Sequence, residues 1–109
     1  VQADRFAAAR DLADRHGAAV VLKGQGSLVA ADGRLALCSA GNPGMASAGM
    51  GDVLSGVIGA LLAQGLAPGD ASRLGTLLHS TAADRVAGQR GTTSLLAADL
   101  APAIAALLP

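Results

Sequence analysis

The residues best suited to do chemistry are Gly49, Met50, Gly51 and Asp52, a Gly-x-Gly-Asp sequence at the start of an apolar segment. The first amides of an α-helix have no partner within the helix, and its N-terminal end is partially positive, so glycines that expose these amides create an anion site. The amides can hold the oxygens of a transferring phosphoryl group, while the Asp52 carboxylate accepts a proton from a hydroxyl. We therefore predict an anion hole at residues 49–51 and a catalytic base at Asp52.

The simpler interpretation of Asp52 is an acid that caps the helix and is stabilised by the helix dipole. Capping requires one acid, whereas further glycines stand at positions 41 and 44, on either side of Asn42-Pro43. This composition favours a loop that a ligand can approach closely. Asn42 in this loop is a candidate substrate contact.

Two familiar phosphate-binding motifs do not match. Residues 44–51 have the spacing of a Walker A loop, but Met50 stands at the lysine position and Gly51 at the serine or threonine position. A dinucleotide-binding fingerprint also fails, because Val29 stands where the third glycine belongs and the following segment is typical of a strand.

The segment after the Gly-x-Gly-Asp sequence has apolar residues at spacings of three and four, which is typical of an α-helix. Small residues occupy most other positions, so we expect this helix to be buried on most sides. An interior glycine costs a helix about 1 kcal/mol relative to alanine, so Gly56 and Gly59 predict that another backbone passes close by. Gly65 and Pro68 predict where the helix ends.

The first third of the chain predicts a helix followed by three strands. Residues 3–16 have an amphipathic helical pattern, and residues 18–22 are typical of a strand covered on both faces. Two further strands are expected at 27–31 and 34–38, joined by an Asp-Gly turn. The first and third strands of such a meander point the same way, so Lys23 and the loop from Ser39 should lie at one edge of the sheet.

Lys23 is a candidate ligand contact at that edge. A lysine at a strand end that simply reaches water is the simpler interpretation. Ligands of open α/β sheets bind at the carboxyl ends of strands, and Lys23 stands between such an end and two glycines. This position favours a nucleotide contact.

Two more helices are expected in the C-terminal half. Asp70 is a candidate cap for the first, and Asp99 for the second, in which Pro102 falls within the tolerated first turn. The apolar face of the first should consist of Leu74, Leu77, Leu78, Ala82 and Val86. His79 is expected to be a structural histidine, because no cluster with metal-ligand spacing accompanies it, and no metal site is predicted.

Composition limits the classes of function. The chain has 109 residues, 51% of them hydrophobic, enough for one domain or part of one. Eight acidic and eight basic residues and a single aromatic residue argue against nucleic-acid binding, and no segment is long and apolar enough to predict a membrane partner. Cys38, the lone cysteine, excludes an internal disulfide, fits a reducing cytoplasm and is expected in the core.

Four segments together resemble the NAD(P)H-hydrate dehydratases of the ribokinase-like superfamily: VVLKGQGSLVA, GNPGMASAGMGDVLSGVIGALLAQGL, LLHSTAADRVA and SLLAADL. The similarity covers nearly the whole chain in the right order, and AGMGDVLSG is highly specific. The resemblance implies an α/β fold, the C-terminal portion of a ribokinase-like domain with about three strands in a mixed sheet and about four helices. Family domains are longer, so residues 1–109 are expected to be a partial domain without its N-terminal portion.

The resemblance also implies an activity, the dehydration of hydrated NADH or NADPH at the expense of ADP or ATP, with Mg²⁺ bridging nucleotide oxygens. Gly51 matches a nucleotide contact of the family, and Asp52 matches a contact to the hydrated cofactor. The family's adenine-nucleotide segment is matched by Lys23, Gly24, Gln25, Gly26 and Ser27. Ser27 stands where many members have threonine, which keeps the hydroxyl.

Two alternatives remain open. A ribokinase-like kinase of a small hydroxylated metabolite would use the same anion hole and base but release a stable phosphorylated product. The chain is also consistent with an inactive nucleotide-binding fragment. In its full-length form a homo-oligomer is a further expectation.

Overall fold

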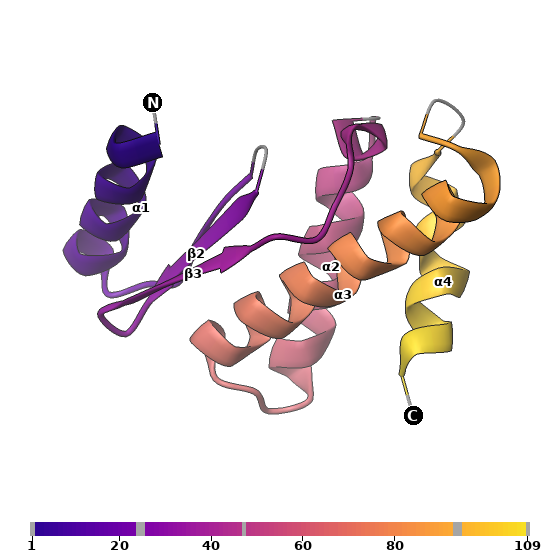
Figure 1. Cartoon of the computed structure of the whole chain (residues 1–109). Helices are drawn as coiled ribbons and strands as arrows, with labels where there is room; N and C mark the ends of the chain where they lie inside the picture. Colours follow the sequence, from indigo (N-terminus) through magenta and orange to yellow (C-terminus); the bar gives the residue numbers. More distant parts are fainter. Residues whose placement is uncertain (1, 24–25, 47, 93–94, 109) are drawn as a thin grey trace.

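The computed structural model of the chain describes residues 2–23, 26–46, 48–92 and 95–108. The elements in chain order are α1 (Gln2–His16), β1 (Val20–Leu22), β2 (Ser27–Ala31), β3 (Arg34–Cys38), the 3₁₀ turn η1 (Pro43–Ala46), α2 (Met50–Ala63), α3 (Pro68–Arg90), the 3₁₀ turn η2 (Ala97–Asp99) and α4 (Leu100–Leu107). Figure 1 shows α1 and the sheet at one end of the molecule and α4 at the other, with α3 running between them. The described residues contain three strands and four α-helices, so the expected α/β content is confirmed.

The three strands form a meander in the order β1-β2-β3, and both pairings are antiparallel. The expected mixed sheet is therefore not found within this set of strands. The hairpin prediction is confirmed: β2 and β3 have the expected bounds, and Asp32 and Gly33 have φ values of 54° and 73°, which suit a tight turn between right-twisted strands. Because β1 and β3 are parallel in direction, their carboxyl ends lie at one edge.

Helices cover the sheet unevenly. Side chains of a strand alternate between faces, so Ala30 packs against Ala9 and Ala13 of α1 while Ala31 faces the start of α3. This double cover buries most of β2. The expected coverage of β1 on both faces is wrong, because β1 is half-buried along its length and, among the described strands, pairs only with β2.

α3 is the central helix, since it packs against β2, β3, α2 and α4. It begins earlier than expected, with Pro68 in the first position rather than Asp70 as the cap, and Asp70 instead pairs with Arg73 at 2.8 Å. The expected apolar face is also wrong in part, because Leu74 and Leu77 are 38% and 51% exposed. Leu78, Ala82 and Val86 are buried as expected, and small residues such as Ala71 and Gly75 complete the buried face.

α2 approaches α3 closely at Gly75 of α3. A Cβ atom there would stand 2.7 Å from Cγ1 of Ile58 in α2. The prediction that Gly56 and Gly59 mark a close backbone is wrong, because a Cβ atom at either position would meet nothing within 4 Å. α2 is likewise not buried on most sides, since it packs on α3 through one face and leaves the opposite face exposed.

The main core lies between α2, α3 and α4, where Met50, Ala82, Leu95 and Leu100 are almost fully buried. α4 begins directly after Asp99 and tolerates Pro102, as expected, but the Asp99 side chain makes no capping hydrogen bond to α4. Asp99 accepts a hydrogen bond from the Leu96 amide at 2.9 Å, and this bond, with Arg90 2.6 Å away, lowers the pKa of its carboxyl.

Cys38, the lone cysteine, was expected in the core. It is half-buried instead, because it ends β3 at the open edge of the sheet.

Among the residues that the structure describes, no helix is both long enough and apolar enough to span a membrane.

Candidate functional site

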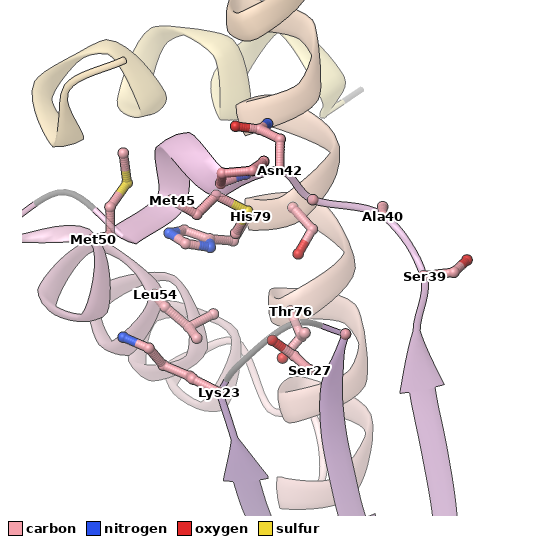
Figure 2. A pocket seen from close by; sticks show the side chains of 14 residues that line it. Lys23, Ser27, Ser39, Ala40, Asn42, Met45, Met50, Leu54, Thr76 and His79 are labelled. Carbon is pink, nitrogen blue, oxygen red and sulfur yellow. The ribbon is translucent and has the colours of Figure 1, made fainter. Parts of the chain in front are cut away.

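A cavity of about 870 Å³ lies at the sheet edge where β1 and β3 end. Four segments line it: the β1–β2 connection, the loop after β3, the first turns of α2, and the middle of α3 (Figure 2). The expected convergence of Lys23 and the loop from Ser39 is therefore confirmed. The size falls within the range of sites that bind small molecules and cofactors, about 300–1,000 Å³.

The N-terminus of α2 adjoins this cavity. Gly49 precedes the helix with φ 85°, a left-handed conformation that favours glycine, and the first backbone bond runs from the Val53 amide to the Gly49 carbonyl at 3.1 Å. The amides of Met50, Gly51 and Asp52 come before that bond. They are the groups that an α-helix leaves for an external acceptor.

Asp52 occupies the third position of α2 and is exposed. The cap position belongs to Gly49, and no side-chain capping hydrogen bond is formed there. Asp52 is therefore not the cap residue of α2, but as an acid in the first turn it is stabilised by the helix dipole, as the simpler interpretation expects. Asp52 is outside the set of residues that line the cavity, although Met50, two positions earlier, lines it.

The Lys23 side chain extends from the end of β1 to the first turn of α2. Its Nζ atom lies 2.6 Å from the position that a Cβ atom would take on Gly51. The side chain also lines the cavity and is exposed at its mouth. A positive charge thus stands beside the amides of the predicted anion hole, which favours negative oxygens at this point.

The loop after β3 is held by Asp84 of α3. The Gly41 amide donates to Asp84 Oδ2 at 2.9 Å, and Asn42 Nδ2 donates to Oδ1 at 2.8 Å. The Gly44 amide in turn donates to Asn42 Oδ1 at 3.0 Å. The oxygen and the nitrogen of the Asn42 side-chain amide are therefore both used to hold the loop. The role of Asn42 as a substrate contact stays a prediction.

His79 lies in the cavity wall and is only 3% exposed. Burial lowers the pKa of its imidazole below the usual 6.5; a hydrogen bond with the Met50 backbone opposes this shift, and the charge of Lys23 adds to it. The ring is therefore neutral at pH 7. The Nε2 atom of His79 and the Oγ1 atom of Thr76 are buried without a hydrogen-bond partner in the part of the chain that the structure describes.

The structure brings some predicted residues together and leaves others apart. The predicted residues that line the cavity are Lys23, Gly26, Ser27, Asn42 and Met50. Gly49, Gly51 and Asp52 stand beside it at the start of α2, and Gly24 and Gln25 lie outside the described residues. Sequence reasoning missed Thr76, Ser80 and Asp84, and gave His79 no part in a site. The available signal was their spacing on one helix, where residues three or four apart share a face.

Comparison with known proteins places this arrangement in a family. The family profile for NAD(P)H-hydrate dehydratase matches residues 1–106. The bifunctional NAD(P)H-hydrate repair enzyme Nnr of Vibrio cholerae is 55% identical over 108 residues, which cover 99% of this chain and 22% of that protein. The ADP-dependent (S)-NAD(P)H-hydrate dehydratase of Neisseria meningitidis is 49% identical over 105 residues, which cover 94% of this chain and 36% of that protein.

A solved structure shows the same fold. The ADP/ATP-dependent NAD(P)H-hydrate dehydratase of Bacillus subtilis, co-crystallised with ATP/Mg²⁺ and soaked with CoA, superposes with a TM-score of 0.89 at 29% identity. The match covers 97% of this chain and 40% of that one, so the chain spans well under half the length of these relatives. The fold is a portion of a ribokinase-like domain, as expected. With residues 1–106 matching the family profile, the chain belongs to the NAD(P)H-hydrate dehydratase family.

Proposed function

We propose that the complete protein containing this chain dehydrates hydrated NADH or NADPH at the expense of an adenine nucleotide. One observation carries the proposal: the cavity, the Lys23 ammonium and the N-terminus of α2 meet at one edge of the sheet. Family membership supports it. The Neisseria relative is named ADP-dependent, and the Bacillus enzyme was co-crystallised with ATP/Mg²⁺.

The nucleotide would bind through the β1–β2 connection and the first turn of α2. Lys23, residues 24–27 and Gly51 would contact it, with the terminal phosphate over the amides of residues 49–51. The Lys23 ammonium stands against Gly51, so it would neutralise part of the phosphate charge at that point. These contacts position the phosphorus for attack and stabilise the charge that develops on its oxygens.

Asp52 would act as the general base. Its carboxylate takes the proton from the hydroxyl of the hydrated nicotinamide ring, and the hydroxyl oxygen attacks the terminal phosphorus. The phosphoanhydride bond breaks, and its electron pair leaves with the shortened nucleotide. The carbon–oxygen bond of the phosphorylated ring then breaks as phosphate departs, a proton is lost from the neighbouring ring position, and the double bond is restored.

The described residues do not form a cage for a resident metal ion. Among them, no group of three histidine, cysteine, aspartate or glutamate side chains is placed to hold one. Mg²⁺ bound mainly by phosphate oxygens fits this arrangement, because Mg²⁺ in nucleotide sites needs only one or two protein carboxylates. When bound there it would neutralise phosphate charge.

The test is a product assay on the complete protein that the gene encodes. It is incubated with hydrated NADH or NADPH, Mg²⁺ and either ADP or ATP. The proposal expects recovery of the near-ultraviolet absorbance of reduced nicotinamide, with one free phosphate per molecule repaired. Accumulation of a stable phosphorylated product without recovered dinucleotide would favour the kinase alternative and overturn the proposal.

A further inference from the structure

The wall of the cavity on α3 contains two polar atoms that the fold leaves unsatisfied. They are Thr76 Oγ1 and His79 Nε2; the residues are 1% and 3% exposed, and neither atom has a hydrogen-bond partner among the residues that the structure describes. Folded proteins pair nearly all buried polar atoms, because an unpaired one costs free energy. Both side chains line the cavity, so a molecule bound there can complete them.

The state of the imidazole decides what His79 can bind. A backbone hydrogen bond that raises the pKa of a histidine is one in which a ring N–H donates to a carbonyl oxygen, here that of Met50. Nε2 has no partner, so the donating atom is Nδ1. Because burial keeps the ring neutral, Nε2 carries no proton and is a hydrogen-bond acceptor. An acceptor of this kind fits a hydroxyl donor and does not fit a phosphate oxygen.

Thr76 and His79 lie three residues apart on α3, and both side chains line the cavity. Residues three apart on a helix have Cβ atoms about 5–6 Å from each other. Nε2 accepts only, whereas the Thr76 hydroxyl both donates and accepts. Two adjacent hydroxyl groups, each able to donate and accept, satisfy this pair. Figure 2 shows the His79 ring extending from α3 with Met45, Met50 and Leu54 near it, apolar side chains that can cover the carbon skeleton of a sugar.

His79 lies next to the predicted phosphate site. His79 bonds to the backbone of Met50, the residue before Gly51, and Gly51 is in contact with the Lys23 ammonium. In a nucleotide, the neutral group next to the phosphates is the ribose, which carries two adjacent hydroxyls. We propose that His79 and Thr76 bind the ribose 2′- and 3′-hydroxyls of the adenine nucleotide and so select ribonucleotides. This inference rests on the nucleotide use proposed above.

The experiment compares ADP, 2′-deoxy-ADP and 3′-deoxy-ADP by calorimetry on the complete protein, without the dinucleotide substrate. The unmodified protein should bind ADP about ten-fold more tightly than either deoxy analogue, because each analogue leaves one of the two buried groups, the His79 acceptor or the Thr76 hydroxyl, unpaired. His79→Leu removes the acceptor and should bind ADP about ten-fold more weakly, with one of the two preferences lost. His79→Gln, whose amide oxygen can reach the place of Nε2, should retain that preference.

Thr76→Val keeps the shape of the side chain and removes only its hydroxyl, so it should abolish the preference that His79→Leu leaves intact. His16→Leu, a change at an exposed histidine on α1, is the matched control and should alter neither. Equal affinity of the unmodified protein for all three nucleotides would overturn the inference without affecting the proposed dehydration. Selective ADP binding without dehydration would instead overturn the proposed function alone, and absence of binding by both ADP and ATP would overturn both.

Discussion

The ammonium nitrogen of Lys23 and the α-carbon of Gly51 are in such close contact that a Cβ atom on Gly51 would stand 2.6 Å from the nitrogen. The end of β1 and the first turn of α2 therefore meet through a lysine that rests on bare backbone. Because the nitrogen is the far end of a flexible side chain, a larger residue at 51 would displace the lysine and leave α2 in place. The Lys23 ammonium can therefore stand at the predicted anion hole only because residue 51 is a glycine and has no Cβ atom.

Gly51→Ala tests this dependence. The new methyl group should push the Lys23 ammonium away and weaken nucleotide binding, up to the 1 to 3 kcal/mol expected for Lys23→Ala, which removes a charge-assisted hydrogen bond. The free energy of unfolding should stay constant or rise by up to about 1 kcal/mol, because alanine favours a helix over glycine. Calorimetry with ADP and thermal melts provide both values.

Gly56→Ala is the matched control, since it makes the same change in the same helix where a Cβ atom meets nothing within 4 Å. It should raise stability and leave nucleotide affinity unchanged. If Gly51→Ala behaves like this control, Lys23 does not serve the anion hole.

Asp52→Asn tests the catalytic base. The amide keeps the size of the side chain but cannot accept the proton, so turnover should fall by about 10² to 10⁴, the usual contribution of general-base catalysis. Nucleotide affinity should stay within a few-fold. Because Asp52 is exposed and makes no capping bond, even Asp52→Ala should cost less than the roughly 1 kcal/mol typical of a lost helix cap. Unchanged turnover in the asparagine variant would remove Asp52 from the mechanism.

Gly75→Ala tests the packing of α2 on α3. Its Cβ atom would stand 2.7 Å from Ile58 Cγ1, and overpacking of this kind costs about 1–3 kcal/mol. Chemical denaturation measures the loss. Gly88→Ala, in the same helix but with nothing within 4 Å, should be neutral or stabilising. A Gly75→Ala variant as stable as Gly88→Ala would show that α2 and α3 do not meet at this distance.

Buried His79 predicts a pH dependence of stability. Its pKa in the folded chain lies below the 6.5 of the unfolded chain, mainly through burial, with the Lys23 charge adding to the shift and the Met50 bond opposing it. Above pH 6.5 the ring is neutral in both states. As the pH falls through 6.5 toward the folded pKa, the unfolded chain takes up the proton first, so the free energy of unfolding decreases and then levels off.

Denaturation at several pH values from about 7.5 to about 5 measures this loss. His79→Gln should flatten the dependence, whereas His16→Gln, which removes the exposed histidine, should not. Equal slopes in the two variants would contradict a neutral buried ring at 79.

The parts of the fold that sequence predicted well are those that local chemistry decides. The hairpin follows from two residues that adopt positive φ values, and the end of α2 follows from Gly65 with φ 99°. The buried face of α3 was predicted in part: Leu78, Ala82 and Val86 are buried as expected, whereas Leu74 and Leu77 have the apolar spacing and are exposed. Which face is buried depends on neighbours that the pattern of one helix does not contain.

The site shows the same division. Lys23 and the glycine-rich loop were predicted to converge because strand direction follows from a meander. Asp84 was not predicted, because it holds an amide 43 residues earlier in the chain. His79 was interpreted as structural because no cluster with metal-ligand spacing accompanies it, and its place in the cavity wall depends on residues far away in the chain.

α3 carries both the wall of the cavity and the anchor of its loop. Thr76 and His79 face the cavity, and Asp84 holds Gly41 and Asn42 from farther along the same helix. Eight residues separate Thr76 from Asp84, about 12 Å at 1.5 Å per residue. Because α3 is one continuous helix, it fixes the distance between the cavity wall at Thr76 and the loop contact at Asp84. A molecule that binds to Thr76 and His79 is therefore also held at a fixed distance from the loop at Gly41 and Asn42.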